Sequence, residues 1–204
     1  MPVNRSFIRK FLDKWETRQT VAYIPCRKRN FTGHNRAADC GEVIGQSGVT
    51  VGTGLDLGQQ GEADLRRMGL DDATISRFRP YLGKKRQDAV AALAVAPLTL
   101  SDAECDAVDN AVHDDYIRRA ADLYDRNTES RSFADQPQEA QAVIVSLFYQ
   151  LGNPFPSKNH TGYPLLYGHL CHGDWQVASH ELQTGFRNYA NRRADEGRLL
   201  REVA

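Results

Sequence analysis

The sequence lacks any long hydrophobic run, and none of its apolar stretches approaches the roughly 20 residues that a membrane-spanning helix requires. It also lacks an excess of one charge, because 26 Lys and Arg residues balance 26 Asp and Glu residues. A zero net charge argues against a polyanion binder of the histone or ribosomal kind, which carries a strongly basic surface. We therefore expect neither membrane insertion nor nucleic acid as a partner.

The N-terminal segment lacks the uninterrupted apolar core of a secretory signal, because charged residues are spread through residues 1–16. We expect no signal peptide in this chain, so delivery outside a cytoplasm would use another route. Internal repeats and low-complexity linkers are also missing. With 41% hydrophobic and 25% charged residues in a length of 204, the composition is that of a single ordinary globular domain, residues 1–204.

Cysteine is scarce, with four residues in the chain. Cys26 and Cys40 bracket a polar segment, where a disulfide would close a loop and add about 3 kcal/mol of stability through loop entropy. Cys105 and Cys171 would then form a second bridge between distant helices, whereas in a reducing compartment all four would be free thiols. The sequence leaves both alternatives open. The spacings fit no compact tetrahedral zinc site, so we expect no metal and no other cofactor.

Hydrophobic periodicity predicts an N-terminal helix, then strand-like and glycine-rich segments, and then helices to the C-terminus. The expected helices are 7–15, 62–68, 71–78, 84–96, 101–124, 137–151, 163–170, 174–183 and one from about 191. Segment 137–151 is apolar around most of its circumference, so it should be the central buried helix. The pattern predicts an α+β fold with a small β-rich lobe, about 17–58, and a larger helical lobe, 1–16 and 59–204.

The most informative segment is the glycine-rich stretch 47–58, in which apolar residues alternate with small or polar ones. The apolar residues share one strand-like parity: Val49, Val51, Leu55 and Leu57. Thr50 and Asp56 therefore face the other side, together with glycines that leave room for another group to approach the backbone. This arrangement is typical of the floor of a polar cleft.

A cleft with two carboxyl groups and a hydroxyl indicates general acid–base hydrolysis of a glycosidic bond. One carboxyl must be protonated to assist the leaving oxygen, and the second must be ionised to activate water or stabilise the cation. Glu16 follows Trp15 at the end of an apolar helix, where partial burial would raise the pKa of its carboxyl. Asp56 is better placed to remain ionised, and Thr50 on the same side could hold a water.

The order of these elements resembles that of the phage-type lysozymes. The segment SGVTVGTGLDLGQ is most similar to the pesticin-like branch, a group of muramidase toxins in which an Asp follows the cleft Thr at this spacing. Three later segments resemble the central helix, the helix after it and the Arg-rich C-terminal helix of these enzymes: AVIVSLFYQLGNPF, HGDWQVASHELQTGF and NYANRRADEGRLL. The resemblance covers most of the chain in the right order and implies a lysozyme-like fold.

Residue by residue, the resemblance implies that Glu16 is the general acid and that Asp56 is the base or electrostatic partner. It implies that Thr50 positions the attacking water. Arg193 matches the arginine that pairs with the catalytic Glu in this family, and Arg192 is the alternative. Such a pair would hold the carboxylate but lower its pKa, so burial must balance it.

Two of these assignments have rivals in the sequence. Arg193 would otherwise form an ordinary surface pair with Asp195 or Glu196. Glu42 is a rival for the acid, because the long segment after residue 25 lengthens the path from the first helix to the glycine-rich stretch. Along an extended chain Glu42 lies too near Thr50 to sit across a cleft from it, unless the backbone folds back. We therefore favour Glu16 as the acid.

The resemblance further implies that Tyr149, Gln150 and Asn153 line the sugar groove, although ordinary helix-end packing would also explain them. The implied reaction is cleavage of the β-1,4 bond between N-acetylmuramic acid and N-acetylglucosamine in peptidoglycan, in the periplasm of target bacteria. Such a domain would serve as an antibacterial effector or toxin, with an immunity protein as a partner, or as a phage endolysin. A non-catalytic peptidoglycan-binding module and an unrelated helical interaction domain are the competing classes.

Overall fold

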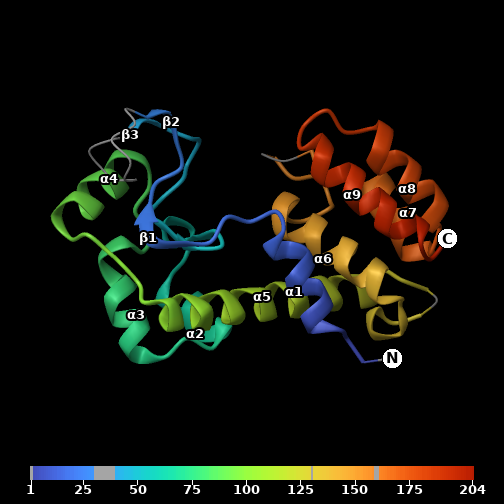
Figure 1. The fold of residues 1–204 in the computed structure, drawn as a ribbon, viewed down its shortest axis with the longest axis horizontal. Helices are drawn as coiled ribbons and strands as arrows, with labels where there is room; N and C mark the ends of the chain where they lie inside the picture. The colour runs from blue at the N-terminus through green and yellow to red at the C-terminus, as the bar shows by residue number, and fades with distance from the viewer. Residues whose placement is uncertain (1, 30–39, 130, 159–160) are drawn as a thin grey trace. The chain divides into compact units, whose positions relative to one another are not determined.

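The computed structural model describes residues 2–29, 40–129, 131–158 and 161–204. The chain divides into two compact units (Figure 1). The helical unit comprises Met1–Trp15 and Tyr116–Ala204, and the sheet unit comprises Glu16–Asp115. The helical unit is therefore assembled from both ends of the chain, with the sheet unit inserted between them in the sequence.

In its described residues the sheet unit contains two small antiparallel sheets. The first has the strand order β1-β4-β5, formed by Gln19–Tyr23, Thr50–Gly52 and Leu55–Asp56. The second pairs β2, Cys26–Arg29, with β3, Cys40–Val43. The described helices of this unit are α2 (Glu62–Met68), α3 (Asp72–Phe78), α4 (Arg86–Val95), the first part of α5 (Asp102–Asp125), and the 3-10 helices η2 (Leu57–Gln59) and η3 (Arg79–Tyr81).

The core of the sheet unit forms as the alternating pattern predicts. The four apolar residues of the glycine-rich stretch are all buried: Val49, Val51, Leu55 and Leu57. Side chains from the following helices, such as Ile75 and Phe78 of α3, are also fully buried. The apolar parity of residues 49–57 is confirmed, and it anchors β4 and β5 in the interior.

The sheet unit extends well past residue 58, where the sequence analysis placed the end of the β-rich lobe. Backbone hydrogen bonds explain the difference. The amide of Arg86 donates to the carbonyl of Ser47 (2.9 Å), and the amide of Leu100 donates to the carbonyl of Thr20 (2.8 Å). Periodicity along the chain identifies helices but not the sheet to which their ends are bonded, so residues 59–115 were grouped with the helical lobe.

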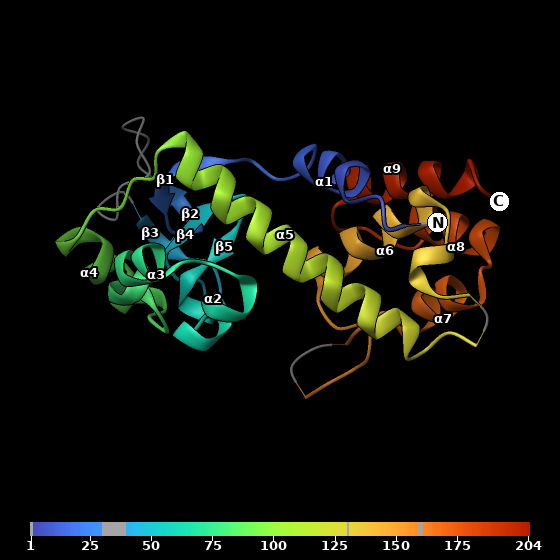
Figure 2. The same ribbon diagram turned by 90° about the horizontal axis from the view of Figure 1, so that it is seen from below.

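The helical unit surrounds α6, Gln138–Leu151, which is buried at every position from Ala140 to Phe148. Helix α6 packs against α1 and α9, and Figure 2 shows the same grouping from below. The prediction of a central buried helix is confirmed. The other elements of this unit are α1 (Arg5–Asp13), the end of α5, η4 (Phe133–Asp135), α7 (Pro164–His172), α8 (Trp175–Thr184) and α9 (Ala190–Arg201).

Most helix boundaries agree with the sequence analysis because local caps define them. The side chains of Asn4 and Asp71 accept the amide hydrogens that open α1 and α3. Ser101 and Glu104 form a reciprocal capping box at the start of α5. The α+β class is confirmed. The N-terminal helix, however, ends at Asp13, two residues earlier than expected.

The cysteines divide into one bridged pair and two free thiols. Cys26 and Cys40 are bonded, with Cα atoms 5.6 Å apart, and they lie on the paired strands β2 and β3 rather than at the ends of a wholly irregular loop. Cys105 and Cys171 are separate buried thiols, so the second bridge considered above was wrong. Burial raises the pKa of each free thiol to about 11.

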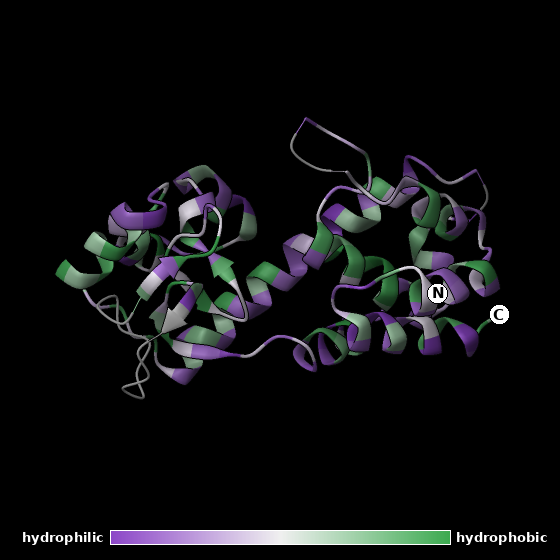
Figure 3. Ribbon diagram, turned by 90° about the horizontal axis from the view of Figure 1, so that it is seen from above, coloured by the Kyte–Doolittle hydropathy of each residue, from purple (hydrophilic) through white to green (hydrophobic). Residues whose placement is uncertain are grey.

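Figure 3 shows polar and apolar residues interleaved along the long helix α5. Among the residues that the structure describes, no helix combines the length and apolar content needed to span a bilayer.

Candidate active site

The candidate site in the sheet unit is built on the hairpin β4–β5. Val51 pairs with Leu55 and Thr50 pairs with Asp56, so the apolar pair shares one face and the polar pair shares the other. Gly52 makes the turn possible because its φ of +60° lies in the region that side chains disfavour. The prediction that the Thr50 hydroxyl and the Asp56 carboxylate lie on the same side is therefore confirmed.

Asp56 is tied to the backbone on both sides of the hairpin. Its Oδ1 accepts hydrogen bonds from the amides of Gly48 (3.0 Å) and Gly58 (2.9 Å), and its Oδ2 has one longer contact with the Gly48 amide (3.2 Å). Burial raises the pKa of Asp56 above its ordinary value, although these amides and the nearby Lys85 act in the opposite direction. This effect of burial was expected at Glu16 and not at Asp56.

Two glycines make this arrangement sterically possible. A Cβ on Gly48 would lie 2.5 Å from the Cα of Gly58, and a Cβ on Gly58 would lie 2.4 Å from the carbonyl oxygen of Lys84. Any larger residue would therefore push the amide donors away from Asp56. At Gly48 and Gly58 the absence of a side chain admits neighbouring backbone.

Thr50 is 3% exposed, and its hydroxyl donates to the carbonyl of Gly48 at 3.3 Å. Thr50 and Asp56 thus both hydrogen-bond to Gly48, the hydroxyl to its carbonyl and the carboxylate to its amide. This shared residue fixes the hydroxyl and the carboxylate relative to each other.

A buried polar cluster holds the turn of the same hairpin. The carboxylate of Asp109 on α5 accepts from the amide of Thr53 (2.8 Å) and from its hydroxyl (3.1 Å), and His113 Nε2 lies 3.2 Å from that hydroxyl. This cluster was not predicted, because Thr53 is 56 residues from Asp109 in the sequence. The available signal was the i, i+4 spacing of two polar residues on one face of a long helix.

The two candidate acids stand in different surroundings. Glu16 is the first residue of the sheet unit and lies partly buried in a bend after α1. Two residues earlier, Lys14 forms an ion pair with Asp195 of α9, which holds the end of α1 in the helical unit. Glu42 is exposed on β3 opposite Arg27, in the smaller of the two sheets.

Arg193 lies inside the helical unit rather than on its surface. It is 1% exposed, its Nη1 lies 3.0 Å from Glu196 Oε2, and its Nη2 donates to Gln150 Oε1. The guanidinium also lies 5.9 Å from the ring centroid of Phe186. The pairing with Glu196 considered in the sequence analysis is present, but as a buried pair and not as a solvated one.

Arg192 and Ser146 complete this buried cluster. Arg192 donates from Nε and Nη2 to the Ser146 hydroxyl at 3.1 and 2.9 Å, and that hydroxyl donates to Glu196 Oε1 at 2.6 Å. Burial raises the pKa of Glu196 to about 7 and lowers that of Arg193. Two arginines therefore share one carboxylate, which is an uncommon composition for a protein interior.

The remaining predicted site residues separate into two groups. Tyr149 and Asn153 line a pocket of about 310 Å³ at the end of α6, together with Arg119 and Tyr116 of α5. The Arg119 guanidinium lies 5.4 Å from the centroid of the Tyr116 ring. Gln150 does not line this pocket, because its side chain accepts from the buried arginine of α9.

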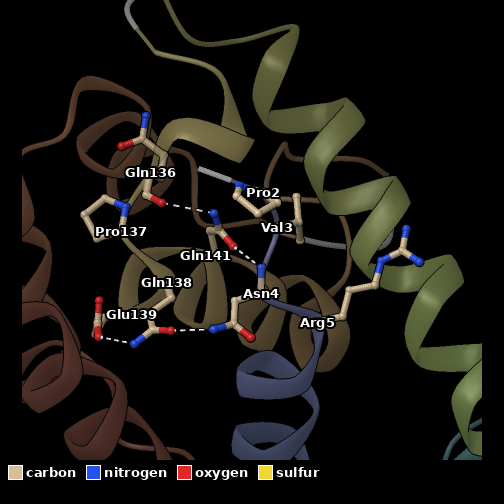
Figure 4. A pocket seen from close by; sticks show the side chains of 9 residues that line it. All are labelled: Pro2, Val3, Asn4, Arg5, Gln136, Pro137, Gln138, Glu139 and Gln141. Atoms are coloured by element: carbon tan, nitrogen blue, oxygen red, sulfur yellow. Dashed lines mark hydrogen bonds between the residues drawn. The ribbon is translucent and has the colours of Figure 1, made fainter.

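A larger pocket of about 590 Å³ lies between the N-terminal segment and the start of α6 (Figure 4). Its polar groups are bonded mostly to one another. Asn4 donates from its amide to Gln141 and from its side chain to Gln138, which in turn donates to Glu139. These contacts dock α1 on α6 and explain the pocket as a structural junction.

Comparison with known protein families identifies a match over most of the chain. A family model described as "Pesticin: Bacterial toxin homologue of phage lysozyme, C-term" matches residues 10–176. The matched range includes Glu16, Thr50 and Asp56 and ends before Arg193. No curated protein matches the chain.

Proposed function

This chain belongs to the pesticin family, the bacterial toxin homologues of phage lysozyme, and on that premise we propose that it hydrolyses peptidoglycan as a muramidase. The bond that we assign is the β-1,4 linkage between N-acetylmuramic acid and N-acetylglucosamine. The observation that carries the proposal is the strand register that pairs Thr50 with Asp56, within the range that the family model matches.

In the proposed mechanism Glu16 protonates the leaving glycosidic oxygen as that bond breaks. Ionised Asp56 accepts a proton from water, and the resulting hydroxide forms the new bond to the anomeric carbon. Asp56 Oδ1 already accepts two amide hydrogens at 3.0 Å or less, so Oδ2 is the oxygen better placed for water. A pKa raised by burial makes ionised Asp56 a stronger base, and Thr50 would orient the water.

Arg193 is the arginine that we assign to the support of the general acid. Within the part of the chain that the structure describes, its Nε and Nη1 have no hydrogen-bond partner, although Nη1 is close to Glu196. A buried cluster with two arginines and one carboxylate has an unbalanced positive charge, which suits the stabilisation of a further anion. Arg192 is less suitable because Ser146 already accepts from its Nε and Nη2.

We assign substrate binding to the pocket at the end of α6. Sugar rings present apolar faces and hydroxyl groups, which suit an aromatic wall next to polar side chains. Tyr149 and Asn153 line this pocket, and Arg119 adds a cation at its edge. Gln150 has a different role, because its contact with Arg193 makes it a residue that orients the arginine.

We propose that the protein serves a bacterium as a toxin or effector against competing bacteria, because the family is named for a toxin. The disulfide between Cys26 and Cys40 is compatible with an oxidising periplasm, where peptidoglycan is accessible. An immunity protein would then protect the producing cell. A phage endolysin with the same activity is the alternative.

The test is release of reducing ends from purified peptidoglycan by the wild type, Glu16→Gln and Glu42→Gln. We expect Glu16→Gln to lower the rate by about 10²-fold or more, which is the usual contribution of a general acid. Glu42→Gln is the matched control and should keep the wild-type rate. Loss of activity in Glu42→Gln alone would transfer the role of the acid to Glu42.

A wild-type protein that binds peptidoglycan without releasing reducing ends would instead be a binding module. A protein that does not bind peptidoglycan at all would be a helical interaction domain. The sugar found at the new reducing end identifies the bond, because a muramidase leaves N-acetylmuramic acid there.

A further inference from the structure

Three charged side chains from one helix are buried together inside the helical unit. Arg192 is 4% exposed, Arg193 is 1% exposed and Glu196 is fully buried. Removing a charge from water is unfavourable unless partners replace the lost hydration, so the geometry of such a cluster is tightly constrained. Apolar residues of similar volume would often stabilise the same contact at least as well, so stability alone does not explain the charged cluster.

The two carboxylate oxygens of Glu196 have different partners. Oε1 accepts the hydroxyl hydrogen of Ser146 at 2.6 Å and lies 3.5 Å from Arg192 Nε. Oε2 faces Arg193 Nη1 at 3.0 Å. Ser146 and Arg192 thus orient one oxygen, which directs the other at Arg193.

Gln150 is the second group that orients Arg193, through Nη2. Since Gln150 is neutral, Glu196 is the anion that the described residues place against this guanidinium. Glu196 is therefore the charged partner of Arg193, whereas Gln150 only orients the guanidinium.

We propose that Glu196 is the positioning residue for Arg193, and that its carboxylate holds the guanidinium in the orientation needed for the reaction. The inference rests on the proposed function, in which Arg193 supports the general acid. Loss of the negative charge on Glu196 removes the anion that lies beside both arginines, and Arg193 then moves away from its place.

The polar and charged groups near Glu196 come from α9, from α6 and from the residue before α7. Arg192 and Arg193 lie on its own helix, Ser146 comes from α6, and Tyr163 precedes α7. Burial keeps Tyr163 neutral at ordinary pH by raising its pKa. Burial raises the pKa of Glu196 to about 7, while both arginines and the Ser146 hydroxyl act to lower it. The carboxyl therefore changes its charge between mildly acidic and mildly basic pH, which makes its role testable with pH.

The experiment compares the wild type, Glu196→Gln and Glu202→Gln on a soluble peptidoglycan glycan between about pH 5 and pH 8.5. Glu202 is the control, because it is exposed at the end of the same helix. At pH 8 we expect kcat of Glu196→Gln to be about ten-fold below that of the wild type, with KM unchanged. Toward pH 5 the ratio of the wild-type kcat to the Glu196→Gln kcat should approach one. The wild-type carboxyl is then protonated and as neutral as the amide.

A ratio that stays constant across this pH range, or a full rate for Glu196→Gln at pH 8, would overturn the inference. A wild type that releases no reducing ends at any pH would contradict the proposed function and the inference together.

Ser146→Ala supplies an independent test if Glu196→Gln does not fold. This variant keeps the charge of Glu196 but removes the hydrogen bond that lowers its pKa. The acidic limb of the wild-type pH profile should move upward by about one pH unit. An unchanged profile in a folded Ser146→Ala protein would show that Glu196 does not control the reaction.

Discussion

Replacement of Gly48 by alanine should disturb the stability of the sheet unit and the candidate site together. The new Cβ would lie 2.5 Å from the Cα of Gly58 and 2.6 Å from the carbonyl oxygen of Lys84. Both neighbours are backbone atoms, which cannot rotate away as a side chain does. Inserting one methyl group into such a contact costs about 1–3 kcal/mol. For a unit of this size we expect a fall in melting temperature of roughly 5–15 °C.

The same substitution should also act on Asp56. The Gly48 amide donates to Asp56 and lowers its pKa, so displacement of this amide should raise the pKa further. The sign follows directly: a carboxylate with a higher pKa is protonated at a higher pH, so the acidic limb of the rate profile moves upward. The measurements are calorimetric melting and the pH dependence of reducing-end release.

Gly168→Ala is the matched control for this experiment. Gly168 lies in the middle of α7, and a Cβ there would meet no atom within 4 Å. Because alanine favours helix, the control should be neutral or more stable by up to about 1 kcal/mol. A Gly48→Ala protein that melts with the wild type and keeps its pH profile would refute the steric and electrostatic argument for this hairpin.

Two further predictions concern the sheet unit. Replacing both Cys26 and Cys40 by serine should lower the free energy of unfolding by about 3 kcal/mol, because the disulfide joins residues with a sequence separation of 14. Urea titration of the oxidised wild type and the variant measures the difference. Coincident unfolding curves would contradict the prediction. Asp109→Ala should cost about 1–3 kcal/mol, because the Thr53 amide loses its buried acceptor; an unchanged urea midpoint would show that water replaces the carboxylate.

Local interactions explain why the sequence predicted most elements correctly. The caps at Asp71 and Ser101 act over three residues, so they can be recognised without knowledge of the fold. The alternation in the glycine-rich stretch predicted the two faces correctly on both strands of the hairpin. Thr50 pairs with Asp56 and Val51 with Leu55, so the turn keeps the polar residues on one face and the apolar residues on the other. The family resemblance read from these residues is confirmed by the matching family model.

Contacts between distant residues account for what the sequence could not show. Asp109 reaches Thr53 across 56 residues, and Arg193 reaches Gln150 across 43. The burial of Arg193 was not predictable, because a charged helix normally faces water and only tertiary packing supplies the partners that make burial tolerable.

The sequence by itself therefore determined the helices, the two faces of the hairpin and the family, because each depends on short-range pattern. Tertiary structure decided which cysteines are bonded, which amides hold Asp56 and which anion accompanies Arg193. Those choices depend on the three-dimensional proximity of chain segments, and proximity is set by the packing of the whole unit rather than by any local run of residues.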